Sequence, residues 1–205
     1  MLWKSWCAAP CLRSSGARKS SLPERIVLIG LRGSGKSLVA AELGRILGWP
    51  WTDLDAEVEK QSGQTIAQLF AHGEAYFREC ETRTLSHIWP GRYRILAAGG
   101  GTVVRQENRA RLRQGAQVVW LAAQPATCAA RLAADSLTAV RRPALTSLGT
   151  HRELATLALT RFPMYWQCAD WVVDTTYRTP AEVAATIVRW LALDSVGTAQ
   201  ERDRL

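Results

Sequence analysis

Residues 30–37 read Gly-Leu-Arg-Gly-Ser-Gly-Lys-Ser, and this segment restricts the possible folds more than any other part of the chain. It matches the pattern G-x-x-x-x-G-K-[ST], in which backbone N–H groups of a tight turn bind phosphate oxygens. Residues 25–29 form a mostly aliphatic run that suits a buried strand, and residues 38–47 have the spacing of an amphipathic helix. A glycine turn with a solvated lysine is the alternative. Because strand, turn and helix agree, the sequence predicts a nucleoside triphosphate site.

Each residue type in this turn suits a triphosphate that binds together with a divalent cation. The three glycines let successive N–H groups point inward, and the N-terminus of the following helix adds a partial positive charge. Lys36 is expected to reach the β- and γ-phosphates, and the Ser37 hydroxyl to ligate Mg²⁺. The motif does not identify the group that receives the phosphate.

Length and composition fit one α/β domain with an extension at each end. The 205 residues, 47% hydrophobic and 21% charged, are enough for a single core. We expect a disordered or targeting-like extension at 1–23, the folded domain at 24–193 and a flexible tail at 194–205. Residues 1–23 carry four Lys or Arg and no acid, which explains half of the net charge of +8. The remaining basic balance suits anionic substrates, and no basic stripe interleaved with aromatic residues predicts nucleic-acid binding.

Cysteine usage and hydropathy point to a reducing compartment and no membrane span. The five cysteines lack metal or disulfide spacing, and no apolar run is long enough to cross a bilayer. A cytoplasmic location is therefore expected, with plastid import of a precursor as the alternative because residues 1–23 faintly resemble a transit peptide. The self-contained core makes a monomer the expected state.

Strand and helix patterns alternate along the chain, which predicts a parallel sheet of about five strands covered by helices on both faces. The strands are expected at 25–29, 49–54, 94–98, 117–121 and 171–174. The helices are expected at 38–47, 56–61, 66–71, 73–88, 106–114, 125–134, 152–161 and after residue 180, with a mobile loop at 135–149.

Three further clusters combine residues that can do chemistry. Asp53 and Asp55 end the second predicted strand, three glycines at 99–101 end the third, and Arg78 and Glu81 share one face of a helix. Ligands of open α/β sheets bind at the carboxyl ends of strands, which is where the first two clusters lie. A helix N-cap, a flexible turn and an intrahelical ion pair are the corresponding structural interpretations.

These segments together resemble shikimate kinase. The resemblance runs from about residue 25 to 193 through GLRGSGKS, DLD, GEAYFRECE, AAGGG, RRPAL and RFPMYWQCADWVVDT, in this order. The first motif is generic to nucleotide-binding enzymes, whereas DLD, FRxxE and GGG together are specific to this family. The resemblance implies a P-loop kinase domain at 24–193, a three-layer α/β/α sandwich with a mobile lid. It also implies ATP-dependent phosphorylation of the 3-hydroxyl of shikimate, on the pathway to chorismate and the aromatic amino acids.

The resemblance assigns roles to individual residues. The ATP phosphates and adenine would be bound by Gly33, Ser34, Gly35, Lys36, Ser37, Leu38, the lid arginine Arg142 and, by a loose match, Arg178. Shikimate would be bound by Asp55, Arg78, Gly100 and Arg161, with both arginines on its carboxylate and Asp55 on its ring hydroxyls. Lys36, Asp53, Asp55 and Arg142 would form the catalytic set, and Ser37 and Asp53 would hold Mg²⁺, Asp53 through water. Whether Asp55 is a general base or only orients the hydroxyl stays open.

One residue departs from the family pattern, and two other functions stay in view. Leu38 stands where relatives commonly carry threonine, which removes one possible phosphate hydrogen bond. A kinase of another small hydroxy acid such as gluconate is one alternative, although GGG and FRxxE argue against it. A non-catalytic ATP-binding regulatory module is the other, and it predicts a damaged catalytic set, which the sequence does not have.

Overall fold

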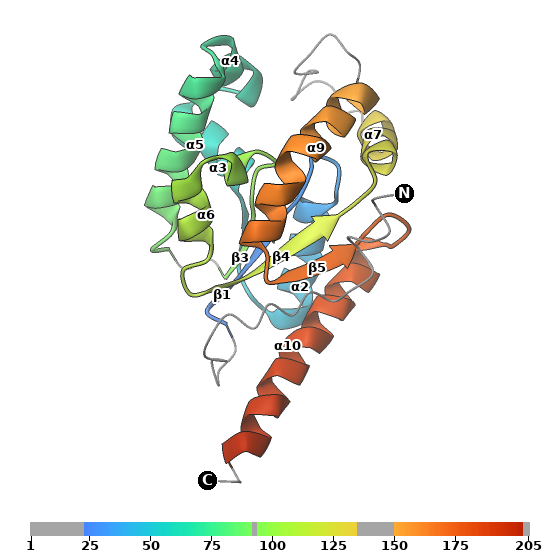
Figure 1. Ribbon diagram of the computed structural model, residues 1–205. Helices are drawn as coiled ribbons and strands as arrows, with labels where there is room; N and C mark the ends of the chain where they lie inside the picture. The colour runs from blue at the N-terminus through green and yellow to red at the C-terminus, as the bar shows by residue number, and fades with distance from the viewer. Residues whose placement is uncertain (1–22, 92–93, 135–149, 203–205) are drawn as a thin grey trace.

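A five-stranded parallel sheet forms the centre of the molecule in the computed structural model, which describes residues 23–91, 94–134 and 150–202 (Figure 1). The strand order is β2-β3-β1-β4-β5, and every strand pair is parallel. The strands are β1 Arg25–Ile29, β2 Trp51–Asp53, β3 Ile95–Ala97, β4 Ala116–Ala122 and β5 Trp171–Asp174. The predicted α/β fold with a parallel sheet of about five strands is confirmed.

Helices connect the strands, as parallel pairing requires. They are α2 Lys36–Leu47, α3 Leu54–Ser62, α4 Ile66–Ala71, α5 Glu74–Ile88, the 3₁₀ turn η1 Thr102–Val104, α6 Gln106–Leu112, α7 Pro125–Ala134, α9 Thr150–Cys168 and α10 Pro180–Arg202. Most of the bounds lie within two residues of the sequence-based prediction.

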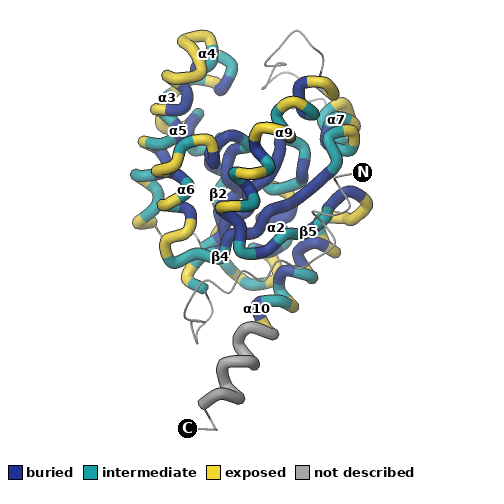
Figure 2. Tube along the Cα trace, in the orientation of Figure 1, coloured by how far each residue is buried: buried dark blue, intermediate teal, exposed yellow. Residues whose placement is uncertain are grey.

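The helices cover the sheet on two sides because successive strand residues point to opposite faces. Val27 and Ile29 of β1 lie in the core beneath α3, α5, α7 and α9, whereas Ile26 and Leu28 lie in a second core beneath α2 and α10. All four side chains are fully buried, and Figure 2 shows the middle strands of the sheet in the dark blue of buried residues, unlike the edge strand β2. The result is the predicted three-layer sandwich.

The strand order creates a crevice next to β1, where ligands of open α/β sheets bind. In the register, Ile26 of β1 lies between Ile95 of β3 and Gln117 of β4. Strands β2 and β3 therefore lie on one side of β1, and β4 and β5 lie on the other. The glycine-rich loop follows β1, Asp53 ends β2 and the three glycines follow β3. The fold therefore gathers the motifs at one edge of the sheet.

Helix α9 is longer than predicted. The sequence analysis expects an end near residue 161. Pro163 itself disfavours a continuous helix, because it lacks an N–H and restricts the residue before it. The helix instead continues through Pro163 to Cys168. Phe162 and Tyr165 pack their rings 5.1 and 5.6 Å from the ring of Trp120, so core packing outweighs the local preference.

The predictions for the two chain ends and for the lid concern the margins of the described residues. Helix α10 continues to Arg202, into the segment at 194–205 that the sequence predicts as a flexible tail. All but the last residue of the predicted extension at 1–23, and the predicted lid at 135–149 with Arg142, lie outside the described residues. The limits of the folded domain stay a prediction.

Candidate phosphate site and central pocket

The glycine-rich loop has the backbone that a phosphate cradle needs. Gly33 and Gly35 have φ values of 80° and 96°, in the left-handed region where a side chain is unfavourable. A Cβ on Gly33 would also lie 2.6 Å from the carbonyl oxygen of Cys128. The Lys36 Nζ donates to the carbonyl oxygens of Gly30 at 3.0 Å and Leu31 at 2.9 Å, so its ammonium group lies over its own loop.

Asp53 joins this loop to the next helix. Its Oδ1 accepts hydrogen bonds from the backbone N–H groups of Asp55 at 2.9 Å and Ala56 at 3.3 Å, which makes it the N-cap of α3. Its Oδ2 accepts a hydrogen bond from the Ser37 hydroxyl. The N-cap interpretation and the site interpretation are therefore compatible, because each carboxylate oxygen has its own partners.

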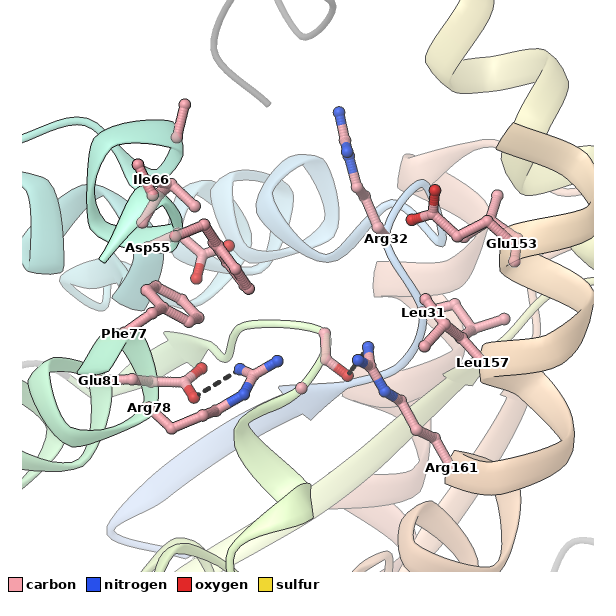
Figure 3. Close-up of a pocket in the computed structure, with 16 residues that line it drawn as sticks. Leu31, Arg32, Asp55, Ile66, Phe77, Arg78, Glu81, Glu153, Leu157 and Arg161 are labelled. Carbon is pink, nitrogen blue, oxygen red and sulfur yellow. Dashed lines mark hydrogen bonds and ion pairs between the residues drawn. The ribbon is translucent and has the colours of Figure 1, made fainter. Parts of the chain in front are cut away.

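A cavity of about 340 Å³, here called the central pocket, opens beside the loop (Figure 3). Its ionisable side chains are Arg32, Asp55, Arg78, Glu81, Glu153 and Arg161. Its apolar wall includes Leu31, Ile66, Phe70, Phe77, Leu154 and Leu157. The pocket therefore combines an apolar lining with a few charged groups, as small polar ligands require.

Arg78 and Glu81 form a buried ion pair at the bottom of the pocket. Arg78 Nη1 lies 2.8 Å from Glu81 Oε2, and the two side chains are 7% and 0% exposed. Thr102 donates its hydroxyl to the other Glu81 oxygen, and Glu74 accepts from the outer side of the guanidinium. Burial raises the pKa of Glu81, and the positive charge of Arg78 opposes that shift. The ion pair fixes the Arg78 guanidinium against the pocket.

The three glycines leave room for these charged groups. A Cβ on Gly99 would lie 2.6 Å from both Asp55 Oδ1 and Glu81 Oε1, and one on Gly101 would lie 2.2 Å from Arg78 Nη2. Gly101 has φ −109°, which any residue can adopt, so the requirement there is steric rather than conformational. The interpretation of this segment as only a flexible turn is wrong for these two positions.

The second arginine of the pocket comes from α9. Arg161 Nη1 donates to the carbonyl oxygen of Gly100 at 3.3 Å, and the fully buried Tyr165 hydroxyl donates to the same oxygen. Burial raises the pKa of Tyr165, which keeps this hydroxyl protonated. Arg161 and Arg78 thus approach the pocket from opposite walls, as Figure 3 shows.

Arg131 of α7 is a residue that the sequence analysis missed. Its guanidinium donates to the carbonyl oxygen of Gly33 at 3.5 Å. It also donates to Thr175, just after β5, at both the side-chain hydroxyl (3.3 Å) and the carbonyl oxygen. The Thr175 hydroxyl in turn donates to Ser34 O at 3.1 Å. These bonds hold the phosphate loop, α7 and the turn after β5 together. No local sequence signal marks Arg131, because its partners are distant in the chain.

The structure places the predicted site residues in two adjoining groups. Lys36 and Ser37 belong to the phosphate loop, and Asp53 contacts it through Ser37. The residues that line the central pocket are Asp55, Arg78, Gly100 and Arg161. Leu38 is 64% exposed in the first turn of α2, so it adds no polar atom to the cradle. Arg178 is exposed in the turn after β5, where its N–H donates to Thr175 O at 3.3 Å.

No group of three or more His, Cys, Asp or Glu side chains within the described residues is arranged to hold a metal ion. None of the helices in the described part of the chain is long and apolar enough to cross a membrane.

Comparisons with known proteins agree with this geometry. The model of the shikimate kinase family matches residues 32–192. A shikimate kinase of Rhodopirellula baltica is 36% identical over 178 residues, which cover 86% of this chain and 95% of the relative. A shikimate kinase of Limosilactobacillus fermentum is 42% identical over 171 residues, covering 82% and 95% of the two chains.

Among solved structures, shikimate kinase from Acinetobacter baumannii in complex with shikimate is similar with a TM-score of 0.78. It is 30% identical in sequence, and the match covers 85% of this chain and 96% of that one. A gluconokinase from Sinorhizobium meliloti gives a TM-score of 0.52 at 17% identity, which shows a shared fold alone.

Proposed function

Because the chain belongs to the shikimate kinase family, we propose that it transfers the γ-phosphoryl group of ATP to the 3-hydroxyl of shikimate. The products are shikimate 3-phosphate and ADP. The observation that carries this proposal is the convergence of the buried Arg78 and Arg161 on one pocket beside a phosphate loop. Two guanidinium groups can bind a carboxylate through paired, charge-assisted hydrogen bonds, which a lysine pair cannot reproduce.

We assign Asp55, which lines the same pocket on the side of Glu81, to the ring hydroxyls of shikimate. Its carboxylate lies near Gly99, because a Cβ there would be 2.6 Å from Asp55 Oδ1. We assign it to the attacking hydroxyl, either as a proton acceptor or as the group that orients it. With the arginines on the carboxylate and Asp55 on the hydroxyls, the two ends of the substrate are distinguished by charge.

The phosphate loop supplies most of the stabilisation that phosphoryl transfer needs. Negative charge spreads over the transferring group in the transition state, so positioning and positive charge dominate catalysis. Lys36 is the cation of the loop. We assign Arg142 of the predicted lid, like Lys36, to the negative charge of the transferring phosphoryl group. Ser37 and Asp53 fit a Mg²⁺ site because they present adjoining hard oxygen donors. When bound there, the cation would neutralise charge on the β- and γ-phosphates.

The remaining contacts follow from the same proposal. We assign Gly33, Ser34 and Gly35 to the phosphates, with the Ser34 N–H also donating to Leu31 O at 3.1 Å within the loop. Arg178 is exposed on the turn assigned to adenine. We take the catalytic unit to be a monomer acting on ATP and shikimate, since the fold has a self-contained core. Light scattering coupled to gel filtration tests that assignment.

An ADP-release assay with three acceptor conditions tests the proposed activity. The protein is incubated with ATP, Mg²⁺ and shikimate, gluconate or no acceptor. We expect turnover with shikimate alone. Faster turnover with gluconate would support a different hydroxy-acid kinase, and a protein that binds ATP but releases no ADP in any condition would instead be a regulatory module.

A further inference from the structure

Arg32 stands at the boundary between the phosphate loop and the central pocket. It is the third residue of the loop, it is half-buried, and it lines the pocket. Its backbone nitrogen would lie 3.2 Å from a Cβ on Gly100, so this part of the loop rests directly on the glycine segment. The Lys36 ammonium binds the carbonyl oxygens of residues 30 and 31 just before it. The backbone that carries Arg32 is therefore held in place.

Glu153 enters the same pocket from the opposite wall. It lies on α9 one and two turns before Leu157 and Arg161, and all three side chains line the pocket on one helix face. Glu153 is only 6% exposed. In Figure 3 its carboxylate points toward the loop on the side where Arg32 stands, away from the guanidinium of Arg161.

The charged groups of the pocket separate into a deep set and a set next to the loop. Arg78 with its partner Glu81, and Arg161 on the Gly100 carbonyl, lie deep (Figure 3). Arg32 and Glu153 lie beside the loop. The deep arginines are sufficient for the single carboxylate of shikimate, whereas the phosphoryl group must cross the boundary where Arg32 stands.

We propose that Arg32 contacts the transferred phosphoryl group from the side of the central pocket, and that Glu153 is a positioning residue for the Arg32 guanidinium. A planar guanidinium can donate two hydrogen bonds to phosphate oxygens, and the negative charge of Glu153 beside the base of the Arg32 side chain favours guanidinium positions near the pocket. The inference rests on the proposed function and deepens it. Loss of Arg32 should therefore weaken binding of shikimate 3-phosphate, which carries the phosphoryl group, more than binding of shikimate, which does not.

Affinities of the two ligands, measured by titration calorimetry, test the role of Arg32. In Arg32→Met, the Kd for shikimate 3-phosphate should rise about 10- to 100-fold, as expected for loss of a charge-assisted hydrogen bond. The Kd for shikimate should change by less than about 3-fold on the same reasoning. Arg32→Lys should give an intermediate value for the product. Arg45→Met is the matched control, since Arg45 is an exposed arginine of α2 that pairs with Glu42.

A double-mutant cycle tests the role of Glu153. If Glu153 acts through Arg32, Glu153→Gln should weaken binding of the product by about 3- to 10-fold when Arg32 is present. With Arg32→Met in the background, the same substitution should strengthen binding, because the carboxylate then faces the phosphate without a compensating cation. A purely structural role for Glu153 would weaken both ligands in both backgrounds.

The possible outcomes separate this inference from the proposed function. If the unaltered protein phosphorylates shikimate but the ratio of the two Kd values is the same in Arg32→Met, the role of Arg32 is wrong and the function stands. If the unaltered protein neither binds nor phosphorylates shikimate, the proposed function fails first. Should Arg32→Met not fold, Arg32→Gln serves in its place, and a product-to-shikimate ratio equal to that of the unaltered protein again overturns the inference.

Discussion

Arg78→Met should separate the structural role of the buried ion pair from its role in binding. The substitution leaves the Glu81 carboxylate fully buried without the guanidinium that lies 2.8 Å from it. Breaking a buried ion pair costs about 3–5 kcal/mol, and we take the lower end because the Thr102 hydroxyl still donates to Glu81. For a chain of this size, about 3 kcal/mol corresponds to a fall in Tm of roughly 6–12 °C.

The double variant Arg78→Met/Glu81→Gln supplies the critical comparison. It removes both charges and keeps an oxygen for Thr102, so its Tm should return to within about 3 °C of the unaltered protein. If Arg78 binds the substrate carboxylate as proposed, turnover of shikimate should be lost in both variants. Adding Glu81→Gln to Arg78→Met would then restore the Tm without restoring turnover.

The stability deficit of Arg78→Met should also depend on pH. Burial raises the pKa of Glu81, and removing Arg78 removes the charge that opposes this shift. A carboxyl group with a raised pKa in the folded state binds more protons folded than unfolded, so its stabilising effect is present at low pH and lost as pH rises. The deficit should therefore be smaller at about pH 5 than at about pH 8.

Thermal unfolding followed by circular dichroism measures these effects. Arg105→Met is the control, because Arg105, between η1 and α6, pairs with Glu79 of α5 near the surface, where solvent screens the ion pair and its contribution is small. The reasoning is refuted if Arg78→Met melts within about 2 °C of the unaltered protein at neutral pH, or if its deficit grows as the pH falls.

Three other predictions follow from the same geometry. Lys36→Met should lower kcat by at least about 1000-fold while the circular dichroism spectrum is kept, and retained turnover would contradict its phosphate role. Gly101→Ala should raise the KM for shikimate more than Gly100→Ala, because its Cβ would lie 2.2 Å from Arg78 Nη2 whereas that of Gly100 would be 3.2 Å from Arg32 N; equal KM values would count against the steric argument. Burial raises the pKa of the Cys128 thiol to about 11, so mass-spectrometric mapping after iodoacetamide at about pH 8 should find it unmodified until the protein unfolds.

Local patterns were sufficient for the sheet, the phosphate loop and the pocket residues that belong to short motifs. The run before Gly30 and the spacing of α2 depend on near neighbours in the chain, so their structure follows from sequence periodicity. The Arg78–Glu81 ion pair could also be predicted from the sequence, since positions three apart share a helix face. What the pattern did not reveal was that the pair is buried.

Features that depend on tertiary contact were missed for a physical reason. The hydrogen bonds of Arg131 join α7 to Thr175, which lies 44 residues further along the chain, and no spacing rule of sequence analysis covers such a distance. Helix α9 was expected to end near residue 161, whereas it continues through Pro163 to Cys168, where packing around Trp120 keeps it intact. Glu153 gave no signal, because an acid in the first turn of a helix is ordinary until the fold turns it into a cavity.

Asp53 cannot be optimised for one task alone. One oxygen begins helix α3 and the other reaches the hydroxyl at the start of α2. Protein engineers who exchange this side chain to tune cation preference would therefore also loosen the helix that presents Asp55. Selection experiments at this position should return few survivors, and compensating changes should arise in the first turn of α3 rather than around the nucleotide.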